Sequence, residues 1–221
     1  MTRVARIVVP DIPHHVTQRG VRRQTTFHEP ADYRAYLSMI AGACQRAGTR
    51  VWAYCLMPNH VHFVMVPSTP DGLRASLSAV HRQHAENINR RYGWQGHLWQ
   101  ARFYSCPMDE GHLIAAVRYV ECNPVRAGLT RNAAEWPWSS ARAHLYGCDD
   151  GFVEVAPMRQ RVADWSAYLS EGSSGEFLET VSQHTRTGRP LGAREFVRAL
   201  EDRLQRPLAL RPAGRKPLQR S

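Results

Sequence analysis

Apolar residues repeat along the first half of the chain with two different periods. Between residues 30 and 47 they fall three to four positions apart, which predicts an amphipathic helix. A second helix is predicted after Gly72, where one face carries Leu73, Leu77, Val80, His84 and Ile88. Two continuous apolar runs, 51–57 and 61–66, lie between these helices, and Pro58 and Asn59 stand between them. Such runs joined by turn residues predict a β-hairpin.

The flanking patterns continue this alternation of strands and helices. Extended segments are predicted at 4–9 and 15–19, and a further strand within 98–108. Asp109 is a predicted N-cap of a helix that ends near Cys122, because a proline follows two residues later. The order strand, helix, strand, strand, helix, strand, helix predicts an α+β fold, in which helices cover a mostly antiparallel central sheet.

The second half of the chain has weaker patterns. Residues 136–148 form an aromatic-rich stretch that we expect to be irregular, and the sequence GSSG at 172–175 predicts a surface loop. A short helix is predicted at 194–206. Residues 209–221, with their prolines and basic side chains, are predicted to be a flexible end.

Charge divides the chain into three segments. The formal net charge is +10, and it is made up of +8 in residues 1–148, −5 in 149–184 and +7 in 185–221. We interpret these segments as a globular domain, an acidic connection and a basic extension. Two basic regions favour a polyanionic partner, above all nucleic acid. A bias of base composition is a competing explanation, because 28 of the 29 basic residues are arginine.

Cysteine spacing and hydropathy indicate the expected cellular compartment. The five cysteines form an odd set without a C-x-x-C pair, so the sequence supports neither a disulfide framework nor a cysteine zinc site. No apolar stretch approaches the roughly 20 residues that cross a bilayer, and the first residues lack the pattern of a signal peptide. We therefore expect a cytoplasmic protein with reduced thiols, associated with the nucleoid and not with a membrane.

Two histidines stand at the start of the second hairpin strand. His60 and His62 are separated by one residue, and the two-residue period of a strand turns both imidazoles to the same face. Two imidazoles so placed can share a metal ion. Histidines at a strand end are also common as surface or hydrogen-bonded residues, and this alternative stays open.

A second candidate group lies at the end of the helix that begins at Asp109. At about 100° per residue, Tyr119 and Asn123 lie away from the apolar face of this helix and one turn apart. If the helix covers the open end of the hairpin, Asn123 can offer an oxygen ligand and Tyr119 points to the same place. The alternative is a half-exposed tyrosine with Asn123 as a helix C-cap.

Three stretches together resemble a known family. The sequences PNHVHFV at 58–64, LWQARF at 98–103 and YVECNPVRAGL at 119–129 are similar in order and spacing to those of REP-associated tyrosine transposases, bacterial relatives of the IS200-like single-tyrosine HUH transposases. The resemblance covers residues 4–148, beginning with HVTQRG at 15–20. The sequence TGRPLG at 187–192 also resembles the extension of this subgroup.

The resemblance implies a ferredoxin/RRM-like HUH nuclease fold and a set of roles. Tyr119 is then the nucleophile, and His60, His62 and Asn123 hold a divalent metal, Mg²⁺, for which Mn²⁺ is expected to substitute. Insertion-sequence relatives generally have glutamine where this chain has Asn123. The implied activity is that of a metal-dependent endonuclease and strand transferase, which cuts single-stranded DNA beside repetitive extragenic palindrome hairpins and forms a 5′-phosphotyrosine link.

Several assignments have rivals. Tyr104 is the main rival nucleophile, with packing in a strand as its ordinary role. The residues expected to contact DNA phosphates are Arg19, Arg102, Arg118 and Arg126, each of which can instead be solvated or paired. His14, His15, His97 and His112 lack matching ligand spacing and are left out of the predicted metal site.

The alternatives at the level of function are a non-catalytic DNA-binding protein that keeps this fold and a metal phosphodiesterase that uses water as nucleophile. A monomer and a homodimer are both compatible with the sequence. For residues 187–206 two roles also remain open. This stretch either follows DNA as an arm or packs on the domain through an apolar helical stripe.

Overall fold

A four-stranded antiparallel sheet forms the centre of the protein, in a computed structural model that describes residues 6–171 and 175–208. Its strands are β1 (His14–Arg19), β2 (Arg50–Met57), β3 (His60–Val66) and β4 (Tyr104–Pro107), arranged in the order β2-β3-β1-β4. The predicted hairpin is confirmed as β2 and β3, which pair from Met57 with His60 to Arg50 with Val66. The predicted α+β fold is also confirmed.

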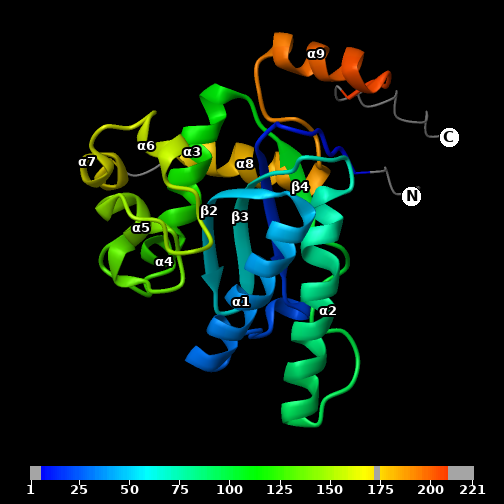
Figure 1. The fold of residues 1–221 in the computed structure, drawn as a ribbon, viewed down its shortest axis with the longest axis vertical. Helices are drawn as coiled ribbons and strands as arrows, with labels where there is room; N and C mark the ends of the chain where they lie inside the picture. Colours follow the sequence, from blue (N-terminus) through cyan, green and yellow to red (C-terminus); the bar gives the residue numbers. More distant parts are fainter. Residues whose placement is uncertain (1–5, 172–174, 209–221) are drawn as a thin grey trace, which may run out of the picture.

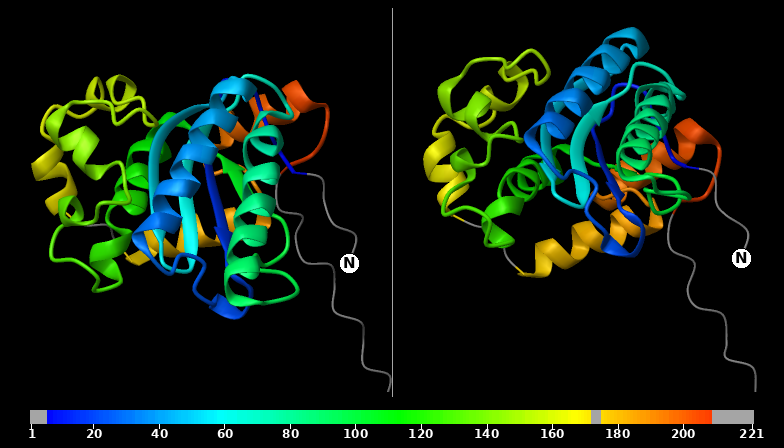
Figure 2. Two further views of the ribbon diagram at one scale, coloured as in Figure 1. Left: turned by 60° about the horizontal axis from the view of Figure 1, so that its bottom comes forward. Right: turned by 90° about the horizontal axis from the view of Figure 1, so that it is seen from below.

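Helices cover both faces of the sheet (Figures 1 and 2). Helices α1 (Pro30–Ala47) and α2 (Gly72–Tyr92) pack together on one face. Helices α3 (Glu110–Glu121) and α8 (Gly175–Thr187) lie on the other face, where α3 contacts β2 and β3 and α8 contacts β1 and β4. The remaining helices are α4 (Asn123–Arg126), α5 (Ala141–Tyr146), α6 (Ala156–Arg159), α7 (Trp165–Ser170) and α9 (Arg194–Leu204), with 3-10 turns at Val21–Arg23 and Ala133–Glu135.

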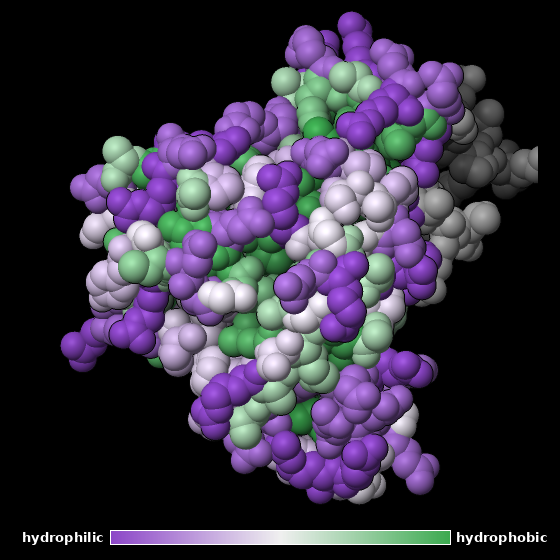
Figure 3. Space-filling model, in the orientation of Figure 1, coloured by the Kyte–Doolittle hydropathy of each residue, from purple (hydrophilic) through white to green (hydrophobic). Residues whose placement is uncertain are grey.

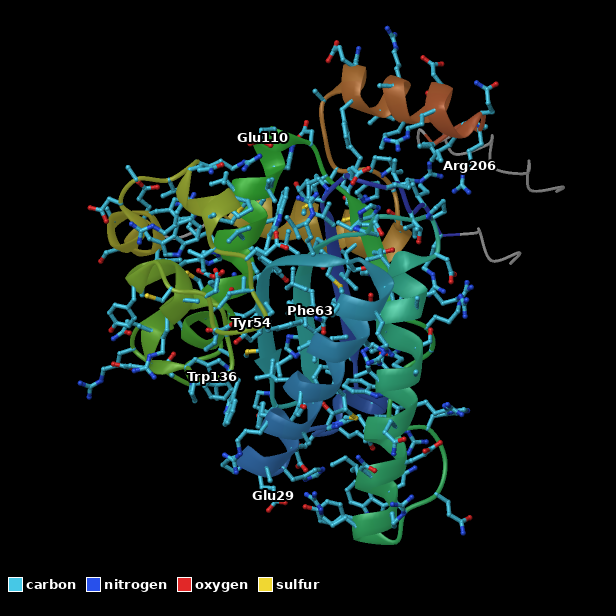
Figure 4. All side chains as sticks on the ribbon, viewed as in Figure 1. Glu29, Tyr54, Phe63, Glu110, Trp136 and Arg206 are labelled. Carbon is cyan, nitrogen blue, oxygen red and sulfur yellow. The ribbon has the colours of Figure 1, made fainter. Side chains whose placement is uncertain are left out.

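The alternation of side chains along β3 divides the core into two layers. Val61, Phe63 and Met65 are buried on the side of α1 and α2, whereas His62 and Val64 face α3. Figure 4 shows Phe63 in the middle of the molecule, where the sheet meets α1. Burying each large apolar side chain contributes roughly 1.5–3 kcal/mol. Both layers therefore hold β3, and with it the two histidines, firmly in register.

Local capping explains where α1 begins and ends and where α3 begins. Glu29 and Asp32 form a capping box at the start of α1, and Gly48 closes that helix with a φ of 61°. The predicted N-cap of α3 is confirmed, because Oδ1 of Asp109 accepts a hydrogen bond from the backbone N–H of His112 at 2.9 Å. The start of α3 determines where Tyr119 lies, two and a half turns later.

The first predicted strand is wrong in its described part. Residues 6–9 form no strand, because Ile7 and Val9 are buried against Leu200 of α9 and not paired with the sheet. The prolines at positions 10 and 13 then separate this stretch from β1. The other short extended prediction, 15–19, is confirmed as β1.

The second half of the chain is more regular than predicted. Within the stretch expected to be irregular, residues 141–146 form α5, whose six residues are too few for a periodic signal. The helix predicted at 194–206 is confirmed as α9, and its buried Leu200 packs on the domain, as one of the two interpretations expected. The predicted loop at 172–175 and the end at 209–221 lie outside the described residues, apart from Gly175, which begins α8.

Polar side chains cover one end of the molecule. Figure 3 shows hydrophilic side chains over the protruding lower end of the molecule, which is formed by the end of α2 and the exposed residues 91–97 that follow it. Among the described residues, none of the helices combines the length and the apolar character needed to cross a bilayer. The division of the chain at residues 148 and 184 stays a prediction.

Candidate functional site

His60 and His62 share the sheet face that is covered by α3. Antiparallel pairing places Arg19 of β1 opposite His60 and Thr17 opposite His62, so these side chains line the same face. The centroids of the two imidazole rings are 4.8 Å apart. His60 follows the two-residue turn of the hairpin directly, which leaves it partly exposed, whereas His62 is buried. The site therefore opens at the turn end of β3.

Both histidines use Nδ1 for a hydrogen bond and leave Nε2 free. Nδ1 of His60 lies 2.6 Å from Oδ1 of Asn59, and Nδ1 of His62 lies 3.0 Å from Nε2 of His15. The Nε2 atom of His62 is buried without a hydrogen-bond partner, and no hydrogen bond within the described residues involves Nε2 of His60. Histidines that bind metals are typically oriented in this way, through the nitrogen that does not bind the ion.

Asn123 supplies a third candidate ligand. Its Nδ2 donates a hydrogen bond to the backbone carbonyl of Tyr119 at 3.0 Å, which orients the amide and leaves the oxygen Oδ1 outside that bond. Within the described residues no cluster of three or more His, Cys, Asp or Glu side chains is placed to share an ion. A metal here therefore depends on two imidazole nitrogens and an amide oxygen, and the unpaired Nε2 of His62 fits that role.

Tyr119 lies against the histidine pair. Its ring meets His62 edge to face with centroids 5.4 Å apart, and meets His15 in the same way at 5.6 Å. The guanidinium of Arg126 lies 4.2 Å from the centroid of the tyrosine ring, and its Nη1 donates to the Tyr119 carbonyl at 3.0 Å. The sheet and α3 thus bring together side chains that are about 60 positions apart in the sequence.

The charge of the site comes from arginine. Burial lowers the pKa of His60 to about 3 and that of His62 well below its usual value, with contributions from Arg19 and Arg126 to both shifts. Burial raises the pKa of Tyr119, while the same two arginines oppose that increase. At neutral pH the site therefore combines neutral imidazoles, a protonated phenol and two guanidinium groups, an environment that attracts anions.

The other two predicted arginines lie elsewhere. Arg118 points to α7, where its guanidinium lies over the ring of Tyr168, and its Nη1 donates at 2.7 Å to Glu171, which follows that helix. Arg102 lines a separate groove of about 580 Å³ beside α2, together with Arg6, Arg74 and Arg82. The structure thus brings Arg19 and Arg126 to Tyr119, but not Arg118 or Arg102.

Tyr104, the rival nucleophile, lies on a different strand from the two histidines. Tyr104 belongs to β4, which is separated from β3 by β1, and its side chain is 40% exposed. It lines a surface groove with residues of α8, including Gln183 and Arg186. No ring contact joins Tyr104 to His60 or His62 within the described residues, whereas Tyr119 contacts His62. The geometry therefore favours Tyr119.

Two further residues reach the site that the spacing of histidines did not indicate. His15, which was left out of the predicted metal site, is hydrogen-bonded to His62. Thr185 of α8 lies behind it, with Oγ1 at 2.7 Å from Nδ1 of His15. Only the alternation along β1 gave a signal for His15, since it places His15 on the same face as Arg19. Nothing local in the sequence indicated Thr185.

The fold and this site agree with what comparison with known proteins shows. Residues 8–123 match the family described as "Transposase IS200 like", and the chain belongs to that family. The match contains the histidine pair, Tyr119 and Asn123. The resemblance found in the sequence is therefore confirmed at the level of the family. Tyrosine transposases are a class of DNA-cleaving enzymes.

Individual relatives agree with this assignment. The chain is 26% identical over 131 residues to a protein of Haemophilus influenzae described as a putative REP-associated tyrosine transposase, covering 52% of this chain and 74% of the relative. It is 21% identical to the REP-associated tyrosine transposase of Escherichia coli K12, covering 56% of this chain and 67% of the relative. A solved structure of a REP-associated tyrosine transposase bound to a REP hairpin has the same fold, with a TM-score of 0.54, 18% identity and coverage of 70% of this chain and 90% of the other.

Proposed function

We propose that this protein is a metal-dependent endonuclease and strand transferase that cuts single-stranded DNA beside palindromic hairpins through Tyr119. One observation carries the proposal: the ring of Tyr119 packs against His62, whose buried Nε2 has no hydrogen-bond partner. A nucleophile beside an unused ligand nitrogen is the arrangement that metal-assisted phosphoryl transfer requires.

The chain supplies a nucleophile, positive charge and ligand atoms. Arg126 lies over the ring of Tyr119 and Arg19 lies opposite His60 on the same sheet face, so both guanidinium groups would bind the phosphate that approaches Tyr119. His60, His62 and Asn123 would hold a divalent ion such as Mg²⁺. When bound, this ion would polarise the phosphate and stabilise the departing oxygen. The two imidazoles are neutral and so have lone pairs for this task.

Tyr119 performs the covalent step of the proposed reaction. Its Oη forms a bond to phosphorus while the bond from phosphorus to the 3′ oxygen breaks, the phenol proton passes to solvent, and the departing oxygen takes up a proton as a 3′-hydroxyl. The product is a 5′-phosphotyrosine. Because this link keeps the phosphodiester energy, attack by another 3′-hydroxyl releases Tyr119 and joins two strands without ATP.

The substrate is inferred from relatives. The structural relative is bound to a REP hairpin, and two curated relatives are described as REP-associated. A hairpin flanked by single strand also fits the charge of this chain, which has basic residues well beyond the catalytic face. We therefore propose repetitive palindromes as the DNA that this protein binds.

The test uses labelled single-stranded oligonucleotides that contain a hairpin copied from repeated palindromes of the protein's own genome. Wild-type protein with Mg²⁺ should give a DNA–protein adduct that survives denaturing electrophoresis. Tyr119→Phe should abolish the adduct and leave hairpin binding within about twofold, because only the attacking oxygen is removed. Tyr104→Phe is the matched control and should retain the adduct.

Three other outcomes would contradict the proposal. An adduct that persists in Tyr119→Phe and disappears in Tyr104→Phe would transfer the role to the strand residue. Cleavage without any adduct would indicate a phosphodiesterase that uses water. Tight hairpin binding without cleavage at any metal concentration would indicate a non-catalytic DNA-binding protein.

A further inference from the structure

A chain of hydrogen bonds leads from helix α8 to the candidate ligand His62. Oγ1 of Thr185 lies 2.7 Å from the carbonyl oxygen of Val181 and 2.7 Å from Nδ1 of His15. Nε2 of His15 then lies 3.0 Å from Nδ1 of His62. His15, His62 and Thr185 are all at least 95% buried, so water does not compete for these positions. These hydrogen bonds join Thr185, which lies far outside the residues 8–123 that match the family, to the centre of the site.

The direction of every hydrogen in this chain follows from its first member. A carbonyl oxygen only accepts, so the Thr185 hydroxyl donates its single hydrogen to Val181. The Thr185 oxygen must then accept from His15, which places the His15 hydrogen on Nδ1. Cys106 adds to this preference, since its Sγ lies 3.6 Å from the same oxygen and its thiol can donate there. The Thr185 hydroxyl therefore has no second hydrogen to donate to His15.

The tautomer of His15 determines that of His62. His15 has a hydroxyl and an imidazole as its two hydrogen-bond partners, so it needs only one hydrogen of its own. With that hydrogen on Nδ1, Nε2 is an acceptor, and His62 must donate from its own Nδ1. Nε2 of His62 is left as a lone pair, in agreement with its lack of any hydrogen-bond partner.

We propose that Thr185 and His15 are positioning residues, which hold His62 in the tautomer that presents Nε2 to a metal ion. Helix α8 is thereby part of the active site, although the family match ends at residue 123. The inference rests on the proposed function only for the metal. The tautomer itself is a property of the free protein and can be measured without DNA, metal or cleavage.

The opposite tautomer would block the ligand atom. If Thr185 loses its oxygen, Nδ1–H of His15 has no acceptor in a buried position, which costs about 1–3 kcal/mol. Moving that hydrogen to Nε2 relieves the cost, but His15 then donates to Nδ1 of His62. His62 must in turn carry its hydrogen on Nε2, the atom required for the metal. A single methyl-for-hydroxyl replacement should thus change a nitrogen two residues along the chain of hydrogen bonds.

The experiment measures tautomers by long-range ¹H–¹⁵N correlation spectra of the full-length protein with ¹⁵N-labelled histidine at neutral pH. In the wild type, His15 and His62 should both have hydrogen on Nδ1. Thr185→Val should convert His62 to the Nε2–H form, and Thr185→Ser should keep the wild-type pattern. The matched control is Thr187→Val on the same helix, because Thr187 is exposed and its hydroxyl donates to the His184 carbonyl.

Metal affinity gives the second measurement. Titration with Mn²⁺, followed by the electron paramagnetic resonance of the free ion, should show about 10–100-fold weaker binding in Thr185→Val than in Thr185→Ser or Thr187→Val. Hydrogen on Nε2 of His62 in the wild type would overturn the proposal without any variant. An unchanged His62 tautomer in folded Thr185→Val, or a changed tautomer with unchanged Mn²⁺ affinity, would also overturn it. Correct tautomers without DNA cleavage would refute the proposed function and leave this inference intact.

Discussion

Glu121 provides a prediction whose size follows from the structure. This side chain of α3 is completely buried two residues after Tyr119, and its carboxylate accepts three hydrogen bonds. Oε1 accepts from Oγ of Ser140 at 2.5 Å and from Nδ1 of His144 at 2.6 Å, and Oε2 accepts from Nε1 of Trp165 at 2.9 Å. His144 lies in α5, Trp165 lies in α7, and Ser140 directly precedes α5. Glu121 therefore joins the helix that carries the nucleophile to the second half of the chain.

The perturbation is Glu121→Gln, which preserves shape and replaces one oxygen by an NH₂ group. With the amide oxygen in place of Oε1, two hydrogen bonds survive and the NH₂ group faces the Trp165 N–H, so two donors meet. In the reverse orientation the NH₂ group is satisfied only if Ser140 donates to the Tyr54 carbonyl instead and His144 changes tautomer, which leaves a hydrogen on the buried Nε2 of His144 without an acceptor. One lost hydrogen bond and a buried donor without an acceptor give an expected loss of about 2–4 kcal/mol in the free energy of unfolding.

Urea unfolding followed by fluorescence and circular dichroism measures this loss. With a slope of about 2 kcal/mol per molar urea, the midpoint should fall by about 1–2 M at unchanged slope. The matched control is Glu110→Gln at the start of the same helix, where the carboxylate is exposed and paired with Arg161, as its position at the edge in Figure 4 illustrates. It should cost no more than about 1 kcal/mol.

A double-mutant cycle tests whether the loss comes from the new NH₂ group facing the Trp165 N–H. Trp165→Phe removes the donor that opposes the new NH₂ group, so it should cost about 1–3 kcal/mol less in the Glu121→Gln background than in the wild type. Additive effects of Glu121→Gln and Trp165→Phe would refute the assignment of the cost to that pair of donors. A loss in Glu110→Gln equal to that in Glu121→Gln would show that burial is not its cause.

Three further predictions concern the metal, acid stability and the basic end. His60→Ala should abolish cleavage at all Mg²⁺ concentrations that activate the wild type, and Asn123→Ala should be milder because water can replace an amide oxygen; full wild-type activity in excess chelator would exclude the metal. Burial lowers the pKa of His14 to about 4, whereas the unfolded side chain binds a proton near pH 6.5, so its contribution is present above pH 6.5 and is lost as the pH falls toward 4. Between pH 7 and pH 5, the free energy of unfolding measured in urea should therefore fall by about 2 kcal/mol more for wild type than for His14→Gln. An equal fall in both proteins would contradict this. Deleting 209–221 should reduce the slope of log K against log salt for hairpin binding by about 0.7–0.9 for each phosphate contact removed, and an unchanged slope would exclude contact of this charge with DNA.

The elements with local signals could be predicted from the sequence alone. The apolar runs on both sides of residues 58–59 specified the hairpin, and the two-residue period put His60 and His62 on one face. The spacing after Asp109 specified α3 with Tyr119 in its last turn, whereas Asn123 begins the next helix, α4. Each of these patterns involves neighbours within one strand or one helix, where backbone geometry alone relates positions to faces.

The surroundings of these residues depend on how separate elements pack together. The β1–β3 register places His15 beside the histidine strand, and a shift of one residue would have turned His15 away from that face. Thr185 reaches His15 across 170 positions because α8 packs on β1 and β4. Glu121 finds its partners on segments that had no periodic signal. Such contacts depend on several elements packing at once, and the periodicity of one segment contains no information about the side chains that another segment will bring to it.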